Sequence, residues 1–123
     1  GHFSAHLDDS VIATLDSFSK SRKIVDVRDA GEFSGKYRRA LKSGHIPSAV
    51  NLEWKKALRK DGTLKSTSEL QKLYSGLGLS KSDEIVTYCQ SGYRAAHSWL
   101  VLKMLGFPNV KNYLGSWYEY GNK

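Results

Sequence analysis

Residues 85–96 read Ile85-Val86-Thr87-Tyr88-Cys89-Gln90-Ser91-Gly92-Tyr93-Arg94-Ala95-Ala96. The first four residues are β-branched or aromatic, which predicts a short buried strand. A loop beginning at Cys89 follows, and a helix begins near Arg94. In an open α/β sheet, the loops beyond the carboxyl ends of the strands form the ligand crevice, so Cys89 lies where a site is expected.

The loop after the strand suits a reactive thiol. If it curls around Cys89, the backbone N–H groups of residues 90–95 converge on the sulfur, and the N-terminus of the next helix adds positive potential. Both effects stabilise a thiolate and an anion bound above it. Gly92 permits a backbone geometry that a larger residue would resist. A lone cysteine after a buried strand is more often a small apolar core residue, but this combination of features favours reactivity.

The segments on either side of this stretch alternate between extended and helical character, which predicts a parallel sheet covered by helices. One helix is expected after the capping box Ser66-Thr67-Ser68-Glu69. The other expected helices cover residues 7–18, 29–33, 54–58, 95–105 and 116–120. The helix over residues 95–105 is apolar on most sides and is expected to be well buried. The expected strands cover residues 23–27, 46–52, 85–88 and 110–113. The fold class is therefore α/β, with four or five short strands.

The composition limits the possible classes of protein. A chain of 123 residues with 40% hydrophobic residues suits one folded domain. Its single cysteine excludes an internal disulfide and a thiolate-rich metal site, and no cofactor or metal is expected. The net charge of +7 comes from scattered basic residues, which favours small anions over nucleic acid. No membrane span or secretory signal is visible, so a cytoplasmic location without a membrane partner is expected.

Arg94 follows Cys89 with four residues between them. Such an arginine can bridge loop carbonyls or complement a substrate anion. Protein tyrosine phosphatases and arsenate reductases use a similar cradle with five intervening residues, because their loop encloses a tetrahedral phosphate. The loop here is one residue shorter, which disfavours phosphoryl transfer.

Four motifs in order resemble the rhodaneses, the thiosulfate sulfurtransferases. The segment Cys89 to Ala95 resembles their active loop, and the three further motifs are Asp26-Val27-Arg28-Asp29-Ala30-Gly31-Glu32-Phe33, Ser43-Gly44-His45-Ile46-Pro47-Ser48-Ala49-Val50-Asn51 and Gly115-Ser116-Trp117-Tyr118-Glu119-Tyr120-Gly121-Asn122. The opening Phe3 to Phe18 resembles an entry helix. The match covers nearly the whole chain and resembles the C-terminal, catalytic domain of a bacterial two-domain enzyme. It implies a three-layer fold with a mainly parallel sheet of about five strands.

The resemblance implies a double-displacement reaction. The Cys89 thiolate would take the sulfane sulfur of a small anionic donor such as thiosulfate, and cyanide or a thiol would then remove that sulfur from the persulfide. The domain is expected to occupy residues 3–123, because Gly1-His2 reads as a remnant of recombinant expression. An N-terminal rhodanese-like domain is expected as a partner outside this chain.

The resemblance also assigns roles to individual residues. Cys89 is the nucleophile, and the substrate-binding loop comprises Gln90, Ser91, Gly92, Tyr93, Arg94 and Ala95. Asp26 and Arg28 are expected to support the loop structurally, and Arg38 and Arg39 to supply an anion contact. His45 is expected to hold a turn, because sulfur transfer from thiosulfate needs no general base.

Two departures from the family pattern leave the donor open. Glu32 stands where vertebrate-type members carry a donor-binding arginine. Vertebrate loops that prefer thiosulfate carry two basic residues directly after the cysteine, where this chain has Gln90 and Ser91. Ser91-Gly92 is similar to mercaptopyruvate-type loops, whereas Gln90 and Arg94 are similar to bacterial thiosulfate enzymes. A rhodanese-like sulfur-carrier or binding module with low turnover of small donors is the alternative from another class, and a phosphatase is a distant third.

Overall fold

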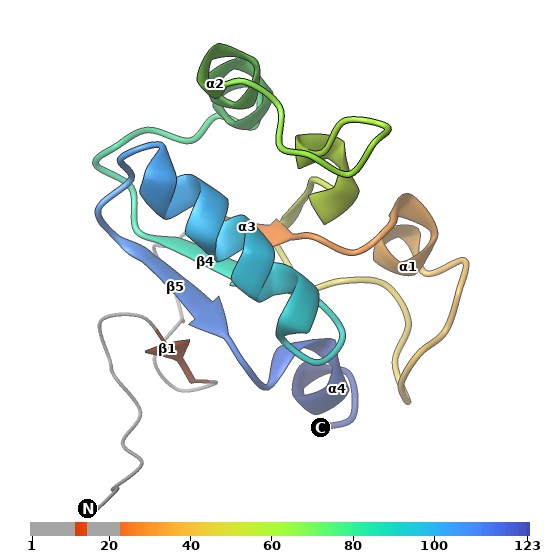
Figure 1. Ribbon diagram of the computed structural model, residues 1–123. Coiled ribbons are helices and arrows are strands. Elements are labelled where there is room, and N and C mark those ends of the chain that lie inside the picture. The colour runs from red at the N-terminus through yellow and green to blue at the C-terminus, as the bar shows by residue number, and fades with distance from the viewer. Residues whose placement is uncertain (1–11, 15–22) are drawn as a thin grey trace, which may run out of the picture.

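A five-stranded parallel sheet forms the centre of the molecule (Figure 1). The computed structural model describes residues 12–14 and 23–123. In spatial order the strands are β1 (Ile12–Ala13), β5 (Val110–Tyr113), β4 (Ile85–Tyr88), β2 (Lys23–Asp26) and β3 (Val50–Asn51). In the central pair, Asp26 is in register with Tyr88. The segments that follow β2 and β4 therefore leave the sheet at the same edge, and Cys89 is the first residue after β4.

Helices cover this sheet, and the predicted three-layer architecture is confirmed. They are α1 (Ala30–Ser34), the 3-10 helix η1 (Trp54–Ala57), α2 (Thr67–Ser75), α3 (Tyr93–Met104) and α4 (Ser116–Tyr120). In Figure 1, α3 crosses the face of β4 and β5, with α2 above it and α4 below. No helix within residues 12–14 and 23–123 is long and apolar enough to cross a membrane.

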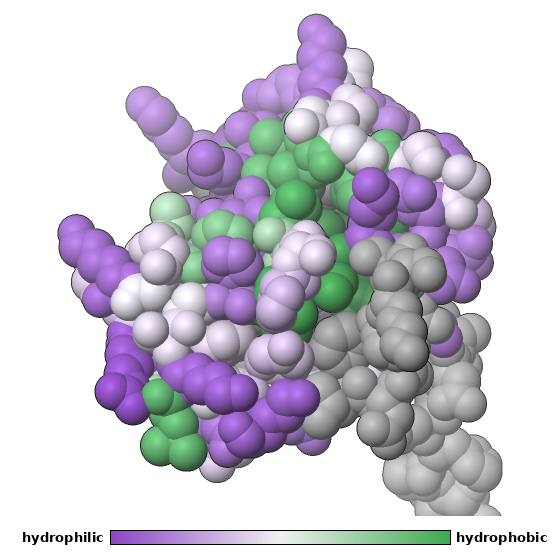
Figure 2. Space-filling model, turned by 180° about the vertical axis from the view of Figure 1, so that it is seen from behind, coloured by the Kyte–Doolittle hydropathy of each residue, from purple (hydrophilic) through white to green (hydrophobic). Residues whose placement is uncertain are grey.

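Alternation along the strands separates two hydrophobic clusters. Val25 and Ile85 belong to the cluster that also contains Leu70, Val101 and other residues of α2 and α3. Ile24 and Val86 belong to the second cluster, with Trp117 of α4. Because successive side chains of a strand point to opposite faces, each cluster lies on one face of the sheet. Seen from behind, hydrophobic groups are visible near the centre of the face and hydrophilic side chains around it (Figure 2).

The helix predicted over residues 7–18 is wrong where the structure describes it. Ile12 and Ala13 form β1, in parallel register with Asn112 and Tyr113, and Ala13 is buried. The rest of that prediction, and the entry helix expected over Phe3 to Phe18, lie outside the described residues. A strand of two residues is too short to show the alternating pattern that identifies a strand in the sequence. The apparent helical spacing of the apolar residues therefore dominated the prediction.

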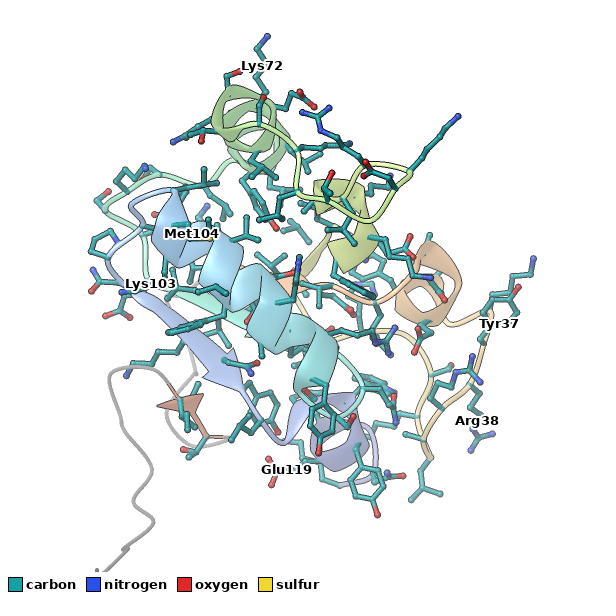
Figure 3. All side chains as sticks on the ribbon, viewed as in Figure 1. Tyr37, Arg38, Lys72, Lys103, Met104 and Glu119 are labelled. Carbon is teal, nitrogen blue, oxygen red and sulfur yellow. The ribbon has the colours of Figure 1, made fainter. Side chains whose placement is uncertain are left out.

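Two further predictions need correction. The strand expected over residues 46–52 is reduced to Val50–Asn51, because Ile46 and Ala49 instead pack as loop residues in the second cluster. The helix expected to be buried on most sides, α3, leaves Leu100 and Met104 exposed, and Met104 is seen at the surface in Figure 3. A helix in an outer layer buries only the face that meets the sheet.

Candidate active site

Cys89 lies at the carboxyl end of the central strand β4, and its side chain is only 1% exposed. The Cys89 loop, residues 89–94, joins this strand to α3. The backbone N–H of Gly92 donates to Sγ of Cys89 over 3.0 Å. This loop therefore turns back on the sulfur, and at least one of its amide groups is directed at the position where a thiolate or a bound anion would carry negative charge.

Gly92 makes this turn possible. Its φ is +94°, and a Cβ added there would lie 3.1 Å from the carbonyl oxygen of Leu114. The left-handed conformation and the close approach of β5's C-terminal extension both favour glycine. The side chain of Asn112 in β5 donates to the Gly92 carbonyl over 3.1 Å, and Thr87 in β4 donates to the Ala95 carbonyl over 3.1 Å. Two neighbouring strands thus position the first turn of α3.

The short helix α4 holds the loop from the other side. Oγ of Ser116 accepts the Cys89 N–H over 3.1 Å and donates to the Tyr113 carbonyl over 2.8 Å. The N–H groups of Trp117 and Tyr118 donate to the carbonyls of Cys89 and Gln90, each over 2.9 Å. The backbone of α4 therefore holds the first two carbonyls of the Cys89 loop.

Arg94 is bound by a carboxylate that comes from α1. Its Nη1 and Nη2 lie 2.9 and 3.2 Å from Oε1 and Oε2 of Glu32, which is buried. This hydrogen-bonded pairing with Glu32 raises the pKa of Arg94, and negative charge on Cys89 adds to the effect. The guanidinium is bound to Glu32 rather than to loop carbonyls.

Glu32 itself is positioned by the start of α1. Its backbone N–H donates to the carboxylate of Asp29, the N-cap residue, over 2.8 Å. This hydrogen bond lowers the pKa of Asp29. The motif that contains both residues therefore delivers a buried carboxylate to the end of the Cys89 loop.

Asp26 and Arg28 form a buried pair next to the site. Nη2 of Arg28 donates to Oδ2 of Asp26 and to the Gly44 carbonyl, each over 2.7 Å. Burial acts to lower the pKa of Arg28, but the hydrogen bond and charge of Asp26 outweigh it and the pKa is raised. The guanidinium also lies 4.9 Å from the Trp117 ring of α4. Its charge is thus balanced by Asp26, and the pair ties the sheet to the segment around Gly44.

The structure brings Arg39, but not Arg38, toward the Cys89 loop. Arg38 donates to the carbonyls of Ala40 and Leu41 in its own segment, and its side chain lies at the edge of the molecule in Figure 3. Nε of Arg39 lies 3.8 Å from Oε2 of Glu32, and the Arg39 carbonyl accepts from Gln90 over 3.2 Å. His45 hydrogen-bonds the Phe33 carbonyl over 2.8 Å and stacks on the Phe33 ring, as expected for a residue that holds a turn.

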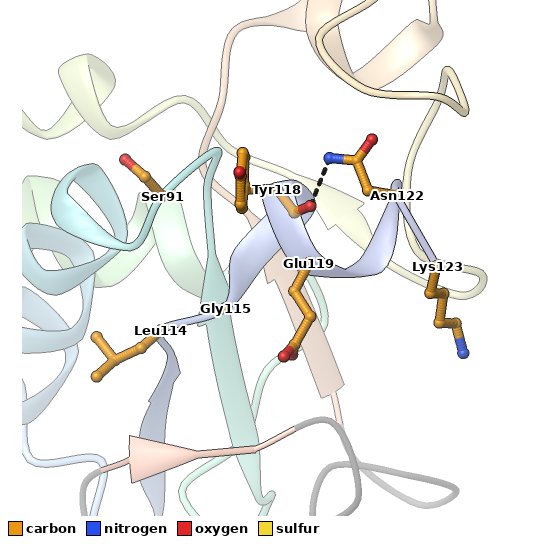
Figure 4. A pocket seen from close by; sticks show the side chains of 7 residues that line it. All are labelled: Ser91, Leu114, Gly115, Tyr118, Glu119, Asn122 and Lys123. Atoms are coloured by element: carbon orange, nitrogen blue, oxygen red, sulfur yellow. Dashed lines mark hydrogen bonds between the residues drawn. The ribbon is translucent and has the colours of Figure 1, made fainter.

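A hollow of about 450 Å³ lies between the Cys89 loop and α4 (Figure 4). Its lining residues are Ser91, Leu114, Gly115, Tyr118, Glu119, Asn122 and Lys123. Glu119 accepts a hydrogen bond from the Tyr113 hydroxyl. Ser91 and Tyr93 of the loop are exposed, and the hollow therefore borders the exposed side of the loop.

Sequence reasoning missed four residues that shape the site. Glu32 was noticed only as a departure, although it binds Arg94, and Ser116, Thr87 and Asn112 were not singled out although each holds a backbone group of the loop or of α3. Ser116 lies in the motif Gly115 to Asn122 and has φ +52°, which is unusual for a residue other than glycine. Neither this conformation nor the hydrogen bond to the Cys89 N–H is visible in the sequence.

The family model of the rhodanese-like domain matches residues 9–123 of this chain. The chain belongs to this family. Among curated relatives, it is 49% identical to the sulfur carrier protein TtuD of Thermus thermophilus and 48% identical to a thiosulfate sulfurtransferase of Corynebacterium glutamicum. Each match covers 80% of the chain but only 38% and 35% of the relative, so the chain spans less than half the length of both proteins.

Solved structures agree with the rhodanese fold. The anaerobic ergothioneine biosynthesis enzyme from Chlorobium limicola superposes with a TM-score of 0.83 at 23% sequence identity, over 94% of the chain and 31% of the enzyme. At this identity the likeness concerns the fold, and it places the described sheet and helices in the rhodanese arrangement.

Proposed function

We propose that this rhodanese-like domain is a sulfurtransferase that carries a sulfane sulfur on Cys89. The observation that carries the proposal is the Gly92 N–H directed at Sγ over 3.0 Å, in a loop whose carbonyls at Cys89 and Gln90 are bound by α4. A thiolate held in this way is a nucleophile, and the same amide can hold the persulfide that replaces it.

In the first step the thiolate attacks the outer sulfur of thiosulfate. A bond forms between Sγ and that sulfur, the sulfur–sulfur bond of the donor breaks, and sulfite leaves with the electron pair. In the second step a thiolate or cyanide attacks the outer sulfur of the persulfide, and Cys89 leaves as a thiolate. No external oxidant, reductant or cofactor enters the balance.

The surrounding residues would divide the remaining work. The backbone of Gln90, Ser91, Gly92, Tyr93 and Ala95 would form the wall around the transferred sulfur, with Arg94 as the nearby positive charge. Asp26 and Arg28 would act through the scaffold, because their charges satisfy each other. Arg39, which is 53% exposed and not enclosed, can reach an anion above the loop, whereas Arg38 is bound to its own segment.

The first donor to test is thiosulfate, as the name of the Corynebacterium relative suggests, with mercaptopyruvate second. The second candidate function is a sulfur carrier, which the name of the Thermus relative supports. A carrier would accept sulfur on Cys89 from a partner protein and would turn over small donors poorly.

The test is the mass of the intact chain after incubation with each donor. Because Cys89 is the only cysteine, a gain of one sulfur atom that is reversed by cyanide can be assigned to it. The Cys89→Ser variant should gain nothing and should lose sulfur transfer by at least about 10³-fold. A folded wild-type chain that gains no sulfur from either donor would refute the proposal.

A further inference from the structure

Exposed large apolar side chains gather around the Cys89 loop. Among the residues that the structure describes, eight such side chains are exposed, and three of them, Leu64, Leu100 and Met104, belong to other parts of the fold. The remaining five, here called the rim, are Tyr37, Leu41, Tyr93, Leu114 and Tyr118, with exposed fractions of 47%, 69%, 85%, 44% and 68%. Concentration of exposed apolar groups next to a site indicates an interaction surface.

Hydrogen bonds join the segments that carry the rim. Gln90 of the Cys89 loop donates to the Arg39 carbonyl over 3.2 Å and accepts the Tyr118 N–H over 2.9 Å. The Leu41 N–H donates to Oδ1 of Asn122 over 2.9 Å. The segment around Leu41, the end of α4 and the Cys89 loop are therefore neighbours at the site.

The same border carries an excess of positive charge. Residues 35–44 contain four basic residues and no acidic one, namely Lys36, Arg38, Arg39 and Lys42. Lys123 adds a fifth charge at the end of α4, where Nζ of Lys42 and Nζ of Lys123 lie 5.9 and 4.8 Å from the Tyr120 ring. Of the two nearby carboxylates, Glu32 binds Arg94 and lies 3.8 Å from Nε of Arg39, and Glu119 accepts a hydrogen bond from the Tyr113 hydroxyl, so the positive charges of this border outnumber the negative ones.

We propose that the rim binds an acidic polypeptide that presents the acceptor thiol to Cys89. The proposal rests on the proposed function and names the partner of that site. Tyrosines and arginines interleaved on an exposed surface suit a protein interface, and the excess positive charge selects an acidic partner and speeds the encounter. Cyanide or a small thiol would leave most of these side chains uncovered.

The delivery step needs nothing beyond the two proteins. The thiolate of the bound polypeptide forms a bond to the outer sulfur of the persulfide, the bond between that sulfur and Sγ breaks, and Cys89 leaves as a thiolate. The acceptor becomes the persulfide. The hollow beside Ser91 offers room for side chains that flank the incoming cysteine.

The experiment compares two synthetic peptides, each with one cysteine and one leucine, in which the other residues are mainly glutamate or mainly serine. The persulfidated chain should transfer sulfur to the glutamate peptide about 10-fold faster at low salt, and the advantage should vanish at high salt. The charge reversal Lys42→Glu with Lys123→Glu should bring the two rates within about 2-fold of each other.

Matched variants separate the rim from general effects. Lys60→Glu with Lys72→Glu makes the same change in net charge, and Lys72 lies at the opposite end of the molecule from α4 in Figure 3. This pair should keep most of the preference. Leu41→Ser should slow delivery to the glutamate peptide, whereas Leu100→Ser, on α3, should not. Leu41→Ser and Leu100→Ser should load sulfur from the donor and release it to cyanide like the wild type. For the two charge-reversal pairs, the ratio of the rates with the two peptides is measured on chains that already carry the persulfide.

The outcomes are distinguishable. A wild type that fails to load sulfur speaks against the proposed function. A wild type that loads normally but serves both peptides equally, or loses its preference as much with the distant pair, overturns the rim as a docking site. Inhibition of delivery by a single-stranded oligonucleotide, stronger than that by a cysteine-free glutamate peptide, would overturn the acidic polypeptide in favour of nucleic acid.

Discussion

Two features of the Gly92 backbone bring the Cys89 sulfur and its hydrogen-bond donor together. Its backbone is left-handed with φ +94°, and a Cβ added to it would lie 3.1 Å from the Leu114 carbonyl oxygen, so the neighbouring backbone would have to shift. Its N–H is the group that donates to Sγ. Any change that moves this backbone therefore affects stability and thiol chemistry together.

Gly92→Ala should separate conformational cost from steric cost when it is compared with Gly62→Ala. Gly62 has φ +89° and open space where a Cβ would lie, so its substitution should reduce the free energy of unfolding by about 1–2 kcal/mol. Gly92→Ala should lose more, and its thiol should react with iodoacetamide about 10-fold more slowly, because a bond to the thiolate is weakened. Denaturant unfolding and alkylation rates measure the two effects. Equal losses in both variants would contradict the steric argument.

At the scale of elements, local sequence signals predicted individual helices and strands well, whereas contacts between residues far apart in the sequence were not predicted. The Ser66 capping box is present, with the Glu69 N–H donating to Oγ of Ser66 over 3.3 Å and α2 beginning at Thr67. The strand predicted over residues 85–88 matches β4. The bond between Glu32 and Arg94 joins residues 62 positions apart, and no local propensity reports such a contact. The Cys89 loop could thus be found from sequence, but the groups that hold it could not.

The dependence of the loop on α4 can be tested at Ser116. Ser116→Ala leaves the buried Cys89 N–H without its acceptor, which should cost about 1–3 kcal/mol of the free energy of unfolding and slow sulfur loading. Ser116→Gly removes the same hydroxyl but relieves the positive φ of +52°, so it should be the more stable variant while loading as slowly. The order of stability should be wild type, glycine, alanine. An alanine variant that loads like the wild type would show that the Ser116 hydroxyl does not position the loop for loading.

The contact between α3 and η1 predicts a pH dependence. The ring of His97 packs edge-on against Trp54 with centroids 5.3 Å apart, and burial lowers the pKa of His97 below its ordinary value of 6.5. The folded state therefore favours the neutral ring. The resulting contribution to stability is present above the unfolded pKa, near 6.5, and is lost as the pH falls. Between pH 7.5 and 5, the free energy of unfolding of the wild type should fall more than that of His97→Gln.

Above pH 7.5 the unfolding curves of these two proteins should run parallel, because His97 is neutral in both the folded and the unfolded state. A wild type and a His97→Gln variant that respond equally to acidification would assign the pH dependence to other groups. The carboxylates titrate at a lower pH than His97, since the pKa of Asp29 is lowered from a value that is already acidic.

On the scale of the whole molecule, the structure shows where part of the net charge of +7 lies. Composition alone favoured an anionic partner without saying where it binds. The fold brings the basic segment of residues 35–44 next to the Cys89 loop, whereas the buried charge of Arg28 is balanced by Asp26. Charges that lie close in space but apart in sequence add their potentials, so the site should attract anions more strongly than any single motif suggests.

This field predicts that salt slows loading by anionic donors but not a reaction with a neutral reagent. Raising the ionic strength from about 0.01 to 0.5 M shortens the screening length from about 30 Å to a few Å, and the second-order rate of sulfur loading from thiosulfate should fall about 3- to 10-fold. Mercaptopyruvate, with one negative charge instead of two, should show a shallower decrease. Alkylation of Cys89 by neutral iodoacetamide should change little, because it depends on the thiolate and not on steering. Parallel decreases for all three reagents would place the effect of salt on the thiolate itself, and the long-range field would then have no part in donor selection.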